Sequence, residues 1–347
     1  MDPITHGLLG ATVAKTTMGR RVPQGLGIIG AVGAMAPDID VLIWSPSDPT
    51  VGWVFHRHFT HSLLLIPLIG LIAALPFIFL KRFADKRGAV IAASIIGCAT
   101  HTMLDSLTTY GTQQLWPFAN TRVTWDAMPI VDPVYTLILV AGLLYTARTQ
   151  KISGVRWGLA LALLYVGFGF WQHHRALNAQ RALLALRGQQ VTRARVLPAP
   201  GWLVLWRSLY IADGRLYADG VRLPWFSAAQ VLPGDSARAL TFADLPAVAQ
   251  ANVEAQRQFK ILEWFADGYL APIDGTANGI GDMRITGAVE SLLGLWGLQF
   301  DAAGAPQRWT PAGQAVGRNY QGLIQTLLFG DEHYRPLNEL PPPSQAQ

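Results

Sequence analysis

The stretch SLLLIPLIGLIAALPFIFL, residues 62–80, contains nineteen residues and no charged side chain. A helix needs about 20 predominantly apolar residues to cross the roughly 30 Å hydrocarbon core of a bilayer, so this stretch predicts a transmembrane helix. Further apolar stretches occupy residues 4–18, 24–44, 88–107, 129–147 and 155–171. Hydropathy does not decide whether the first two cross the membrane or form a re-entrant pair, so we expect four to six transmembrane segments.

The composition of the whole chain also indicates a membrane protein. Of its 347 residues, 51% are hydrophobic and 14% are charged, whereas ordinary soluble domains are about 25% charged. Residues 1–171 contain 12 Lys and Arg and 8 Asp and Glu, against 15 and 14 in residues 172–347. The single cysteine, Cys98, excludes an internal disulfide framework and a Cys-rich zinc site.

This change in composition near residue 172 predicts the domain organisation. We expect a mainly α fold, with a polytopic helical membrane domain over residues 1–171. An amphipathic connecting helix follows over residues 172–200, and a smaller extramembrane α+β domain over residues 201–340. Two Asp-Gly pairs after residue 200 are typical of hairpin turns, but no motif in this domain indicates its role.

Basic residues in the short loops predict the orientation in the membrane. They are Lys15, Arg20, Arg21, Lys81, Arg82, Lys86, Arg87, Arg148, Lys151 and Arg156. If six segments cross, all of these lie on one side, which the positive-inside rule makes cytoplasmic. The C-terminal domain and the loops at residues 45–61 and 108–128 are then extracytoplasmic. The net charge of +5 is therefore a topology signal, and we expect no nucleic-acid partner.

Histidine and aspartate residues gather at the ends of apolar segments on the predicted outer side, in the motifs MDPITH, APDID, HRHFTHS, HTMLD and VDP. Ionisable residues at membrane depth are costly and usually mark a functional site. Imidazole and carboxylate are the usual ligands of a divalent metal where thiolate is absent. The candidate ligands are His6, Asp38, Asp40, His56, His61, His101 and Asp105. We expect one or two zinc ions, with manganese as the alternative metal.

The spacing of these residues restricts how they act together. His101 and Asp105 are four apart, which places both on one helix face as two ligands of one ion, or makes Asp105 a bridging carboxylate. Asp38 and Asp40 are two apart and cannot point the same way in regular structure, so we expect one to ligate and the other to orient a histidine. Simpler interpretations remain open: a structural His–Asp pair between helices, a turn aspartate, and a solvated loop histidine.

The motifs MDPITHGLLGA, APDID, HRHFTHSLL and HTMLDSLTTYGTQQLWPF together resemble the bacterial membrane-bound metal-dependent hydrolase family (YdjM-like), over roughly residues 1–170. The resemblance implies a multi-helix inner-membrane protein and a metal-dependent hydrolase. The order of the ligands is also remotely similar to zinc-dependent phospholipase C and P1-type nucleases, which cleave phosphoesters. On that likeness one zinc would use His6 and another would use Asp38 or Asp40, His61 and His101, with Asp105 bridging them. A second His-xxx-Asp is absent, which leaves a third zinc without its ligands.

We therefore expect a plasma-membrane hydrolase with its site at the outer interface. The metal would lower the pKa of a bound water to about 7 and polarise an ester or phosphoester. Asp40 or Asp132 is the candidate general base. Arg57, or Arg122 on the same predicted face, would hold an anionic head group. Because the site lies at head-group depth, the expected partner is a membrane lipid or a lipid-linked substrate.

Two other functions remain open. A non-enzymatic membrane protein would use the cluster as a structural metal site and its C-terminal domain as an extracytoplasmic interaction module. Structural sites fill every coordination position, whereas catalytic sites keep one open, and the surplus of candidate ligands over four favours a two-metal or catalytic site. A metal or proton transporter would carry its ionisable residues near the membrane midplane, whereas these residues lie towards one face.

Overall fold

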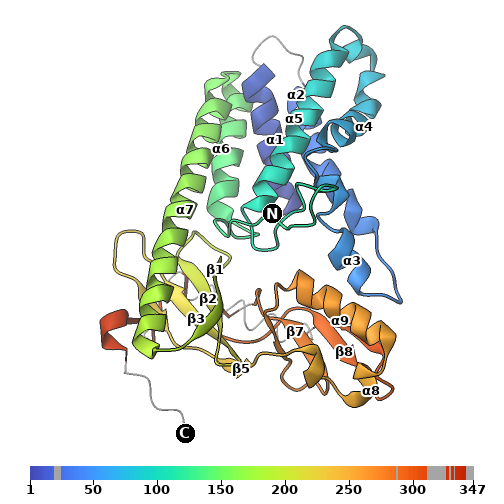
Figure 1. Cartoon of the computed structure of the whole chain (residues 1–347). Coiled ribbons are helices and arrows are strands. Elements are labelled where there is room, and N and C mark those ends of the chain that lie inside the picture. The colour runs from blue at the N-terminus through green and yellow to red at the C-terminus, as the bar shows by residue number, and fades with distance from the viewer. Residues whose placement is uncertain (19–24, 287, 311–325, 328–329, 332, 341–347) are drawn as a thin grey trace. The chain divides into compact units, whose positions relative to one another are not determined.

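The computed structural model describes residues 1–18, 25–286, 288–310, 326–327, 330–331 and 333–340 (Figure 1). The chain divides into two compact units: Met1–Ile43 with Phe55–Phe170, and Trp44–Val54 with Trp171–Gln347. The division after Phe170 is close to the change in composition near residue 172. The sequence did not predict that the segment Trp44–Val54 belongs to the second unit. The basic pair Arg20 and Arg21, used above for the orientation, lies outside the described residues.

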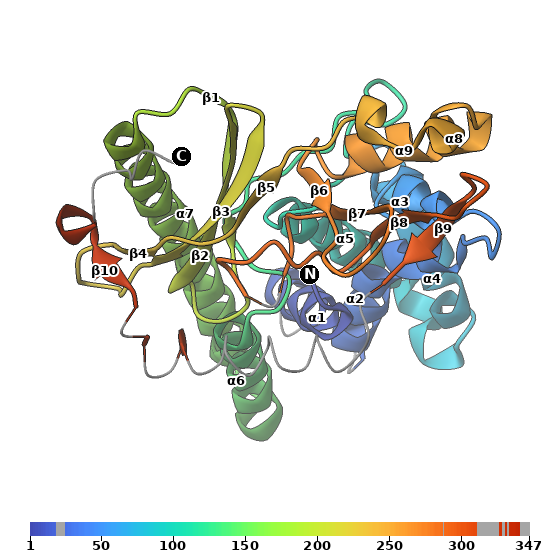
Figure 2. The ribbon, with the colours of Figure 1, turned by 90° about the horizontal axis from the view of Figure 1, so that it is seen from below.

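The first unit is helical. It contains α1 (Pro3–Met18), α2 (Leu26–Met35), the 3₁₀ helices η1 (Ala36–Leu42), η2 (Phe59–His61) and η3 (Lys81–Lys86), α4 (Ile66–Ile78), α5 (Arg87–Ser106) and α6 (Pro133–Thr149). Two more helices, α3 (Thr50–Phe55) and α7 (Ser153–Arg187), are each shared between the units. Within this unit α1, α2 and α5 pack side by side, and α4 packs on α5 (Figures 1 and 2). The predicted helical character of the N-terminal half is confirmed.

Fewer of these helices are long enough to cross a membrane than the sequence predicted. Among the described residues, two apolar segments have the length and composition, Lys81–Ser106 and Ser153–Arg187. The bent pair Thr50–His61 and Ile66–Ile78 makes a third if it counts as one span. The chain turns at residues 62–65, which leaves α4 with 13 residues, about 20 Å at 1.5 Å per residue. The described helices thus support two or three spans rather than four to six.

Small residues bring α1, α2 and α5 into backbone contact. A Cβ on Gly30 of α2 would lie 2.5 Å from the carbonyl O of Gly10 in α1. A Cβ on Gly97 of α5 would overlap the carbonyl O of Gly30, and one on Gly33 would overlap the backbone of Ser94. Close approach through small residues is how membrane helices gain packing energy where no hydrophobic force acts between them. This packing holds the middle parts of α1 and α5 against α2.

Replacing Gly97 by leucine is expected to destabilise the protein by about 3 kcal/mol, because the new side chain would collide with the α2 backbone and overpacking is costly. Thermal unfolding of the detergent-purified protein measures the effect. Gly88→Leu is the matched control, since Gly88 lies on the same helix and a Cβ added there would have no atom within 4 Å. Equal unfolding temperatures for the two variants would contradict the proposed packing.

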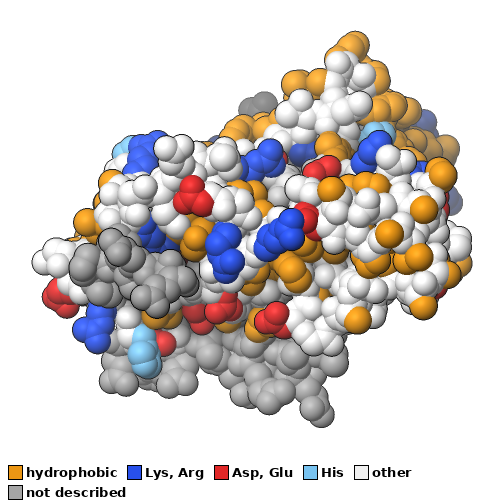
Figure 3. Space-filling view, turned by 60° about the horizontal axis from the view of Figure 1, so that its bottom comes forward, with side chains coloured by type: hydrophobic (Ala, Val, Ile, Leu, Met, Phe, Trp, Pro, Cys, Tyr) orange, Lys and Arg blue, Asp and Glu red, His pale blue; other side chains and the backbone are white. Residues whose placement is uncertain are grey.

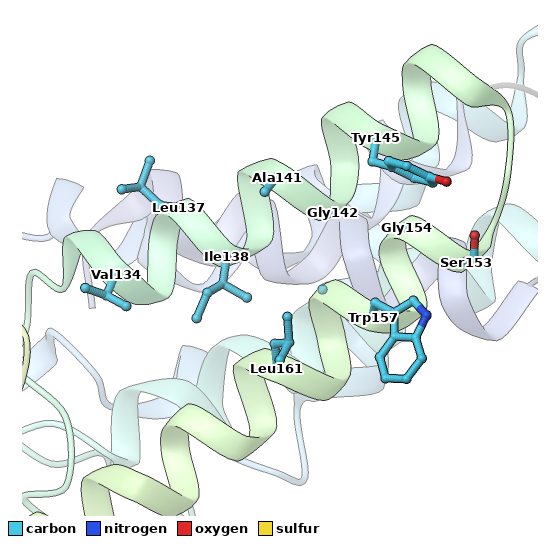
Figure 4. A pocket seen from close by; sticks show the side chains of 11 residues that line it. Val134, Leu137, Ile138, Ala141, Gly142, Tyr145, Ser153, Gly154, Trp157 and Leu161 are labelled. Atoms are coloured by element: carbon cyan, nitrogen blue, oxygen red, sulfur yellow. The ribbon is translucent and has the colours of Figure 1, made fainter.

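The hairpin of α6 and α7 repeats this close packing. A Cβ on Gly142 of α6 would lie 2.8 Å from the carbonyl O of Gly154 and 3.0 Å from the Cα of Gly158, both in α7. Beside this contact lies an apolar hollow of about 590 Å³ (Figure 4). Its wall includes Val134, Leu137, Ile138, Tyr145, Trp157 and Leu161. Exposed apolar side chains of this kind suit a helix hairpin that faces lipid.

The second unit contains two antiparallel sheets. The first has the order β1-β2-β3-β4-β10 with β5 paired to β3, and the second has the order β6-β7-β8-β9. The strands of the first sheet are β1 (Val191–Pro198), β2 (Leu205–Ala212), β3 (Arg215–Arg222), β4 (Gln230–Leu232), β5 (Ser236–Arg238) and β10 (Arg335–Pro336). Those of the second are β6 (Leu270–Pro272), β7 (Gly279–Asp282), β8 (Gly297–Phe300) and β9 (Pro306–Trp309). The short helices are η4 (Phe242–Asp244), α8 (Ala247–Gln250), α9 (Val253–Phe265) and η5 (Leu337–Glu339).

The C-terminal half is thus sheet-rich, as predicted, but the connecting helix is shorter than expected. It was predicted over residues 172–200, whereas α7 ends at Arg187 and residues 191–198 form β1. Gly188 takes a left-handed conformation, φ 61°, which commonly ends a helix. The last turns of α7 lie beside the first sheet (Figure 2). There Arg187 pairs with Asp219 at 2.8 Å.

Buried polar contacts hold the second unit together. The Arg207 side chain of β2 is buried, and it donates to the carbonyl oxygens of Met283 at 3.0 Å and Val289 at 2.6 Å. Burial lowers the pKa of Arg207 to about 10.

On the face drawn in Figure 3, acidic and basic side chains are interspersed. Mixed charge of this kind is typical of an ordinary polar protein surface.

Candidate metal site

Four side chains from three elements of the helical unit converge on one point. Asp38 comes from η1, His61 from η2, and His101 and Asp105 from the last turns of α5. One donor atom of each side chain lies within 4.8 Å of the other three. All are buried except Asp38, whose side chain is 21% exposed. We refer to these four residues as the ligand cluster.

Most of the distances within the ligand cluster are close to those between the ligands of one metal ion. The Nε2 atoms of His61 and His101 lie 2.9 Å apart, and Asp105 Oδ2 lies 3.4 Å from each. Asp38 Oδ1 lies 3.6 Å from His61 Nε2 and 3.3 Å from His101 Nε2. Zinc at about 2.0–2.2 Å from each donor in a tetrahedron separates neighbouring donors by about 3.3–3.6 Å. The four distances between a histidine nitrogen and a carboxylate oxygen fall in this range, whereas the two histidine nitrogens lie closer together than one bound ion would hold them.

The other ring nitrogen of each histidine shows which atom is free to ligate. His101 Nδ1 donates to the carbonyl O of Ala34 at 2.5 Å, and His61 Nδ1 lies 3.2 Å from Asp40 Oδ2. Because these oxygens accept, Nδ1 of each histidine carries a proton. Two Nε2 atoms that face each other at 2.9 Å then require a proton or a metal cation between them. The flanking carboxylate oxygens stabilise either cation, and they supply the further ligands that a metal ion needs.

Asp40 is buried and hydrogen-bonded through both carboxylate oxygens. Oδ1 accepts from His56 Nδ1 at 2.8 Å. Oδ2 accepts from the Arg57 backbone N–H at 3.0 Å and from Thr60 Oγ1 at 2.6 Å, in addition to its contact with His61. A carboxylate with these partners orients the loop and the histidine rather than acting as a free base. Thr60 was not among the predicted site residues, although it directly precedes the predicted ligand His61 in the HFTH motif.

Arg57 lies against the ligand cluster in a strained backbone conformation. Its φ is 65°, a left-handed value that costs a non-glycine residue about 1–3 kcal/mol. The side chain is buried, with Nε 3.0 Å from Asp105 Oδ2, and Nη1 donates to Thr108 Oγ1 at 2.9 Å. Strain of this kind persists at functional sites where the surroundings enforce it. Arg57 therefore presents a positive charge to the cluster.

His6 lies next to the ligand cluster without being part of it. Its ring stacks on that of His101 with centroids 3.7 Å apart, and its Nε2 lies 3.0 Å from Asp105 Oδ1. The amino group of Met1 contacts the same oxygen, a contact that sequence analysis did not predict. Asp105 thus directs one oxygen at His6 and the other at the cluster. A ligand role for His6 would require an ion on the Oδ1 side of Asp105.

Asp132 has the contacts of a helix cap. Its Oδ1 accepts from the backbone N–H of Tyr135 at 3.0 Å, at the start of α6, where Pro133 is the first helical residue. Its Oδ2 accepts from the hydroxyl of Tyr165 at 3.0 Å. Proline at the first position and aspartate as the N-cap are both favoured at helix starts. These contacts account for the position of Asp132 at the start of α6.

His56 lies at the edge of the site. With Asp38 and Asp40 it forms a second group of residues whose spacing suits an ion, and its side chain is 39% exposed. A cavity of about 1,010 Å³ opens beside it, and the wall of this cavity includes Asp38, His56, Arg57 and Thr60. The ligand cluster is therefore accessible from a cavity in the helical unit.

Comparisons with known proteins place the chain in a family. The family model described as YdjM inner membrane protein matches residues 1–176, just over half of the 347 residues and all of the candidate site. The inner membrane protein YbcI of Escherichia coli (strain K12) is 31% identical over 137 residues, which cover 37% of this chain and 75% of that protein. No solved structure matches the chain. The chain belongs to the YdjM inner membrane protein family.

Proposed function

We propose that this protein is a metal-dependent hydrolase of the bacterial inner membrane, which cleaves an ester or phosphoester bond of a membrane lipid or lipid-linked substrate. The observation that carries the proposal is the pair of histidine Nε2 atoms that face each other at 2.9 Å and are flanked by two carboxylate oxygens. Such nitrogen and oxygen donors suit zinc, with manganese second. The family and YbcI are inner membrane proteins by name, which supports the location.

Asp38, His61, His101 and Asp105 would hold one ion. When bound, a divalent ion lowers the pKa of a water to about 7 and polarises the scissile group. Asp38 is the member of the ligand cluster that also lines the cavity, so substrate would approach from its side. Asp40 would keep His61 in the tautomer that presents Nε2 to the ion.

His56 is the residue best placed to move a proton. Its Nδ1 pairs with Asp40 at 2.8 Å, which leaves Nε2 as the basic nitrogen. Its ring is 39% exposed and lines the cavity. By contrast Asp40 and Asp132, the two candidate bases from sequence analysis, are buried and occupied by other partners. We therefore assign His56 as the general base.

Arg57 would bind the negative charge of the substrate. Its side chain lines the cavity and lies 3.0 Å from Asp105. A guanidinium in this position attracts an anionic head group and stabilises charge that develops on a phosphoryl or acyl oxygen.

The basic residues of η3, including Lys81 and Lys86, support a cytoplasmic location for the N-terminal end of α5. The ligand cluster at the other end, and the C-terminal unit, would then be extracytoplasmic.

Turnover of defined lipids tests the proposal. Purified protein loaded with zinc is incubated with vesicles of phosphatidylethanolamine, phosphatidylglycerol and a polyprenyl diphosphate in water enriched in oxygen-18. Mass spectrometry of both cleavage products is expected to find one heavy oxygen atom in one of the two, with both products formed in the presence of metal and absent after chelation. Cleavage that leaves no heavy oxygen in either product would indicate group transfer, and no product from the metal-loaded protein would refute hydrolysis of these lipids.

One observation favours a second function. The four donors of the ligand cluster suffice to fill a tetrahedral site, and structural zinc sites are closed in this way. The protein would then be a non-enzymatic membrane protein with a structural metal site, and its sheet-rich unit would be an extracytoplasmic interaction domain. In that case chelation lowers the unfolding temperature, no lipid is turned over, and His56→Ala changes neither property.

A further inference from the structure

We infer that the cavity beside the ligand cluster is a groove for a single hydrocarbon chain of an anionic lipid, whose phosphate or ester end lies at Asp38 and Arg57. This inference rests on the proposed function, because it names the substrate class of the same site. It goes further because it assigns the part of the cavity that holds the hydrocarbon chain and the part that holds the head group. The evidence is the composition of the cavity wall, the direction of the groove and the exposure of its apolar side chains.

The wall of the cavity combines polar and apolar surfaces. Its volume of about 1,010 Å³ is at the upper end of the 300–1,000 Å³ typical of small-molecule sites. The apolar part comes from α2 with η1 on one side and from α4 on the other, and includes Val32, Met35, Ile39, Ile69, Ile72 and Pro76. The polar part is the edge of the ligand cluster. An amphiphile matches such a wall better than a wholly polar ligand does.

The direction of the groove follows from α4. This helix starts at Ile66, five residues after the ligand His61, so its first turn is the end nearest the cluster. Wall residues continue from Ile69 to Pro76, seven residue steps or about 10 Å along the helix. The apolar surface therefore extends away from the cluster along a helix axis. A hydrocarbon chain has the extended shape that this surface accommodates.

The apolar wall is open to its surroundings. Ile39, Leu42 and Ile72 are 64%, 70% and 55% exposed, although all three are large apolar side chains. Contiguous exposed apolar surface of this kind marks a membrane or ligand contact. In a chain of an inner membrane family, a lipid can enter sideways with its chain in apolar surroundings throughout. Among the described wall residues Arg57 is the only lysine or arginine, and together with a metal ion bound at Asp38 it would attract an anionic head group.

Photolabelling of the full chain in lipid nanodiscs tests the groove. The probe is hexadecyl phosphate with a diazirine either at the end of the chain or beside the phosphate, and labelled peptides are mapped by mass spectrometry. The terminal diazirine is expected to label α4 between Ile69 and Pro76, and the other to label residues near Ile39 or Arg57. Unlabelled hexadecyl phosphate should compete, whereas hexadecyltrimethylammonium should not. Even labelling of all lipid-facing helices, or equal competition by both, would overturn the inference.

Two variants locate the chain more closely. Ala73→Trp places bulk in the wall of the groove and is expected to reduce labelling about tenfold. Leu68→Trp places the same bulk at an exposed position of α4 outside the wall, and is expected to change labelling less than about twofold. Equal labelling of the two variants would contradict the assignment of the chain.

The ligand variant His101→Ala separates this inference from the proposed function. It removes a metal ligand but no residue of the groove wall, so chain labelling should persist while metal-dependent turnover is lost. Retained labelling of a wild-type protein that turns over no lipid would refute the hydrolase alone. Turnover without specific labelling of α4 would refute the groove alone.

Discussion

Alanine at His101 is expected to abolish metal-dependent turnover while the protein still inserts into the membrane. The change removes one donor of the ligand cluster and the hydrogen bond to the carbonyl O of Ala34 at the end of α2. Loss of residues that merely support metal ligands costs about 10–100-fold in affinity or activity, and loss of a ligand should exceed this. Alanine at Asp105 should have the same effect. Turnover and the amount of protein in the membrane fraction are measured together.

A second histidine provides the matched control. His58 precedes the ligand His61 by three residues, but its ring contacts Phe59 and Trp116 and it belongs to neither group of candidate ligands. His58→Ala is therefore expected to retain both metal and turnover. Full activity of His101→Ala, or a loss in His58→Ala as large as in the ligand variants, would contradict the assignment of the site.

Alanine at His56 is expected to lower kcat by about 10²–10⁴ while metal content is unchanged, because a general base contributes an acceleration of that size. The ring lines the cavity, and its Nδ1 is held by Asp40 at 2.8 Å. His56→Gln keeps a donor for Asp40 but has no basic nitrogen, so it should fold like the wild type and lose the same activity. Steady-state kinetics and metal analysis of the same samples measure both quantities.

The two His56 variants also distinguish the alternatives. Loss of metal in His56→Ala would show that His56, Asp38 and Asp40 hold an ion, instead of an Asp–His pair that moves protons. Unchanged kcat in both variants, with metal retained, would remove His56 from the mechanism. Because His56→Gln keeps the hydrogen bond to Asp40, a loss of activity in this variant cannot result from a disrupted loop alone.

Part of the site follows from local spacing. His101 and Asp105 are four residues apart, and helical periodicity alone predicts that they share a face, which is where the structure places both. The two-residue spacing of Asp38 and Asp40 predicted different roles for them, and in the structure only Asp38 joins the ligand cluster while Asp40 contacts His61 from behind. These expectations needed no knowledge of tertiary structure.

Other features depend on tertiary contacts that local patterns do not encode. The occupation of both Asp40 oxygens depends on the folding of the loop that carries Thr60, and the cap at Asp132 depends on Tyr165 from the next helix. More spans were predicted than the described helices support, because hydropathy does not register the turn at residues 62–65 or the change to 3₁₀ geometry in η1. An apolar stretch in the sequence can contain such a break, and the helix in the structure is then shorter than the stretch.

The central claim is that the ligand cluster binds a metal ion, and metal content per chain measures this most directly. Detergent-purified wild type is compared with His101→Ala and Asp105→Ala after reconstitution with zinc or manganese. We predict one ion per wild-type chain, lost in both variants. No bound metal in the wild type, even after reconstitution, would contradict the account, and the facing nitrogens of His61 and His101 would then share a proton instead of a metal ion.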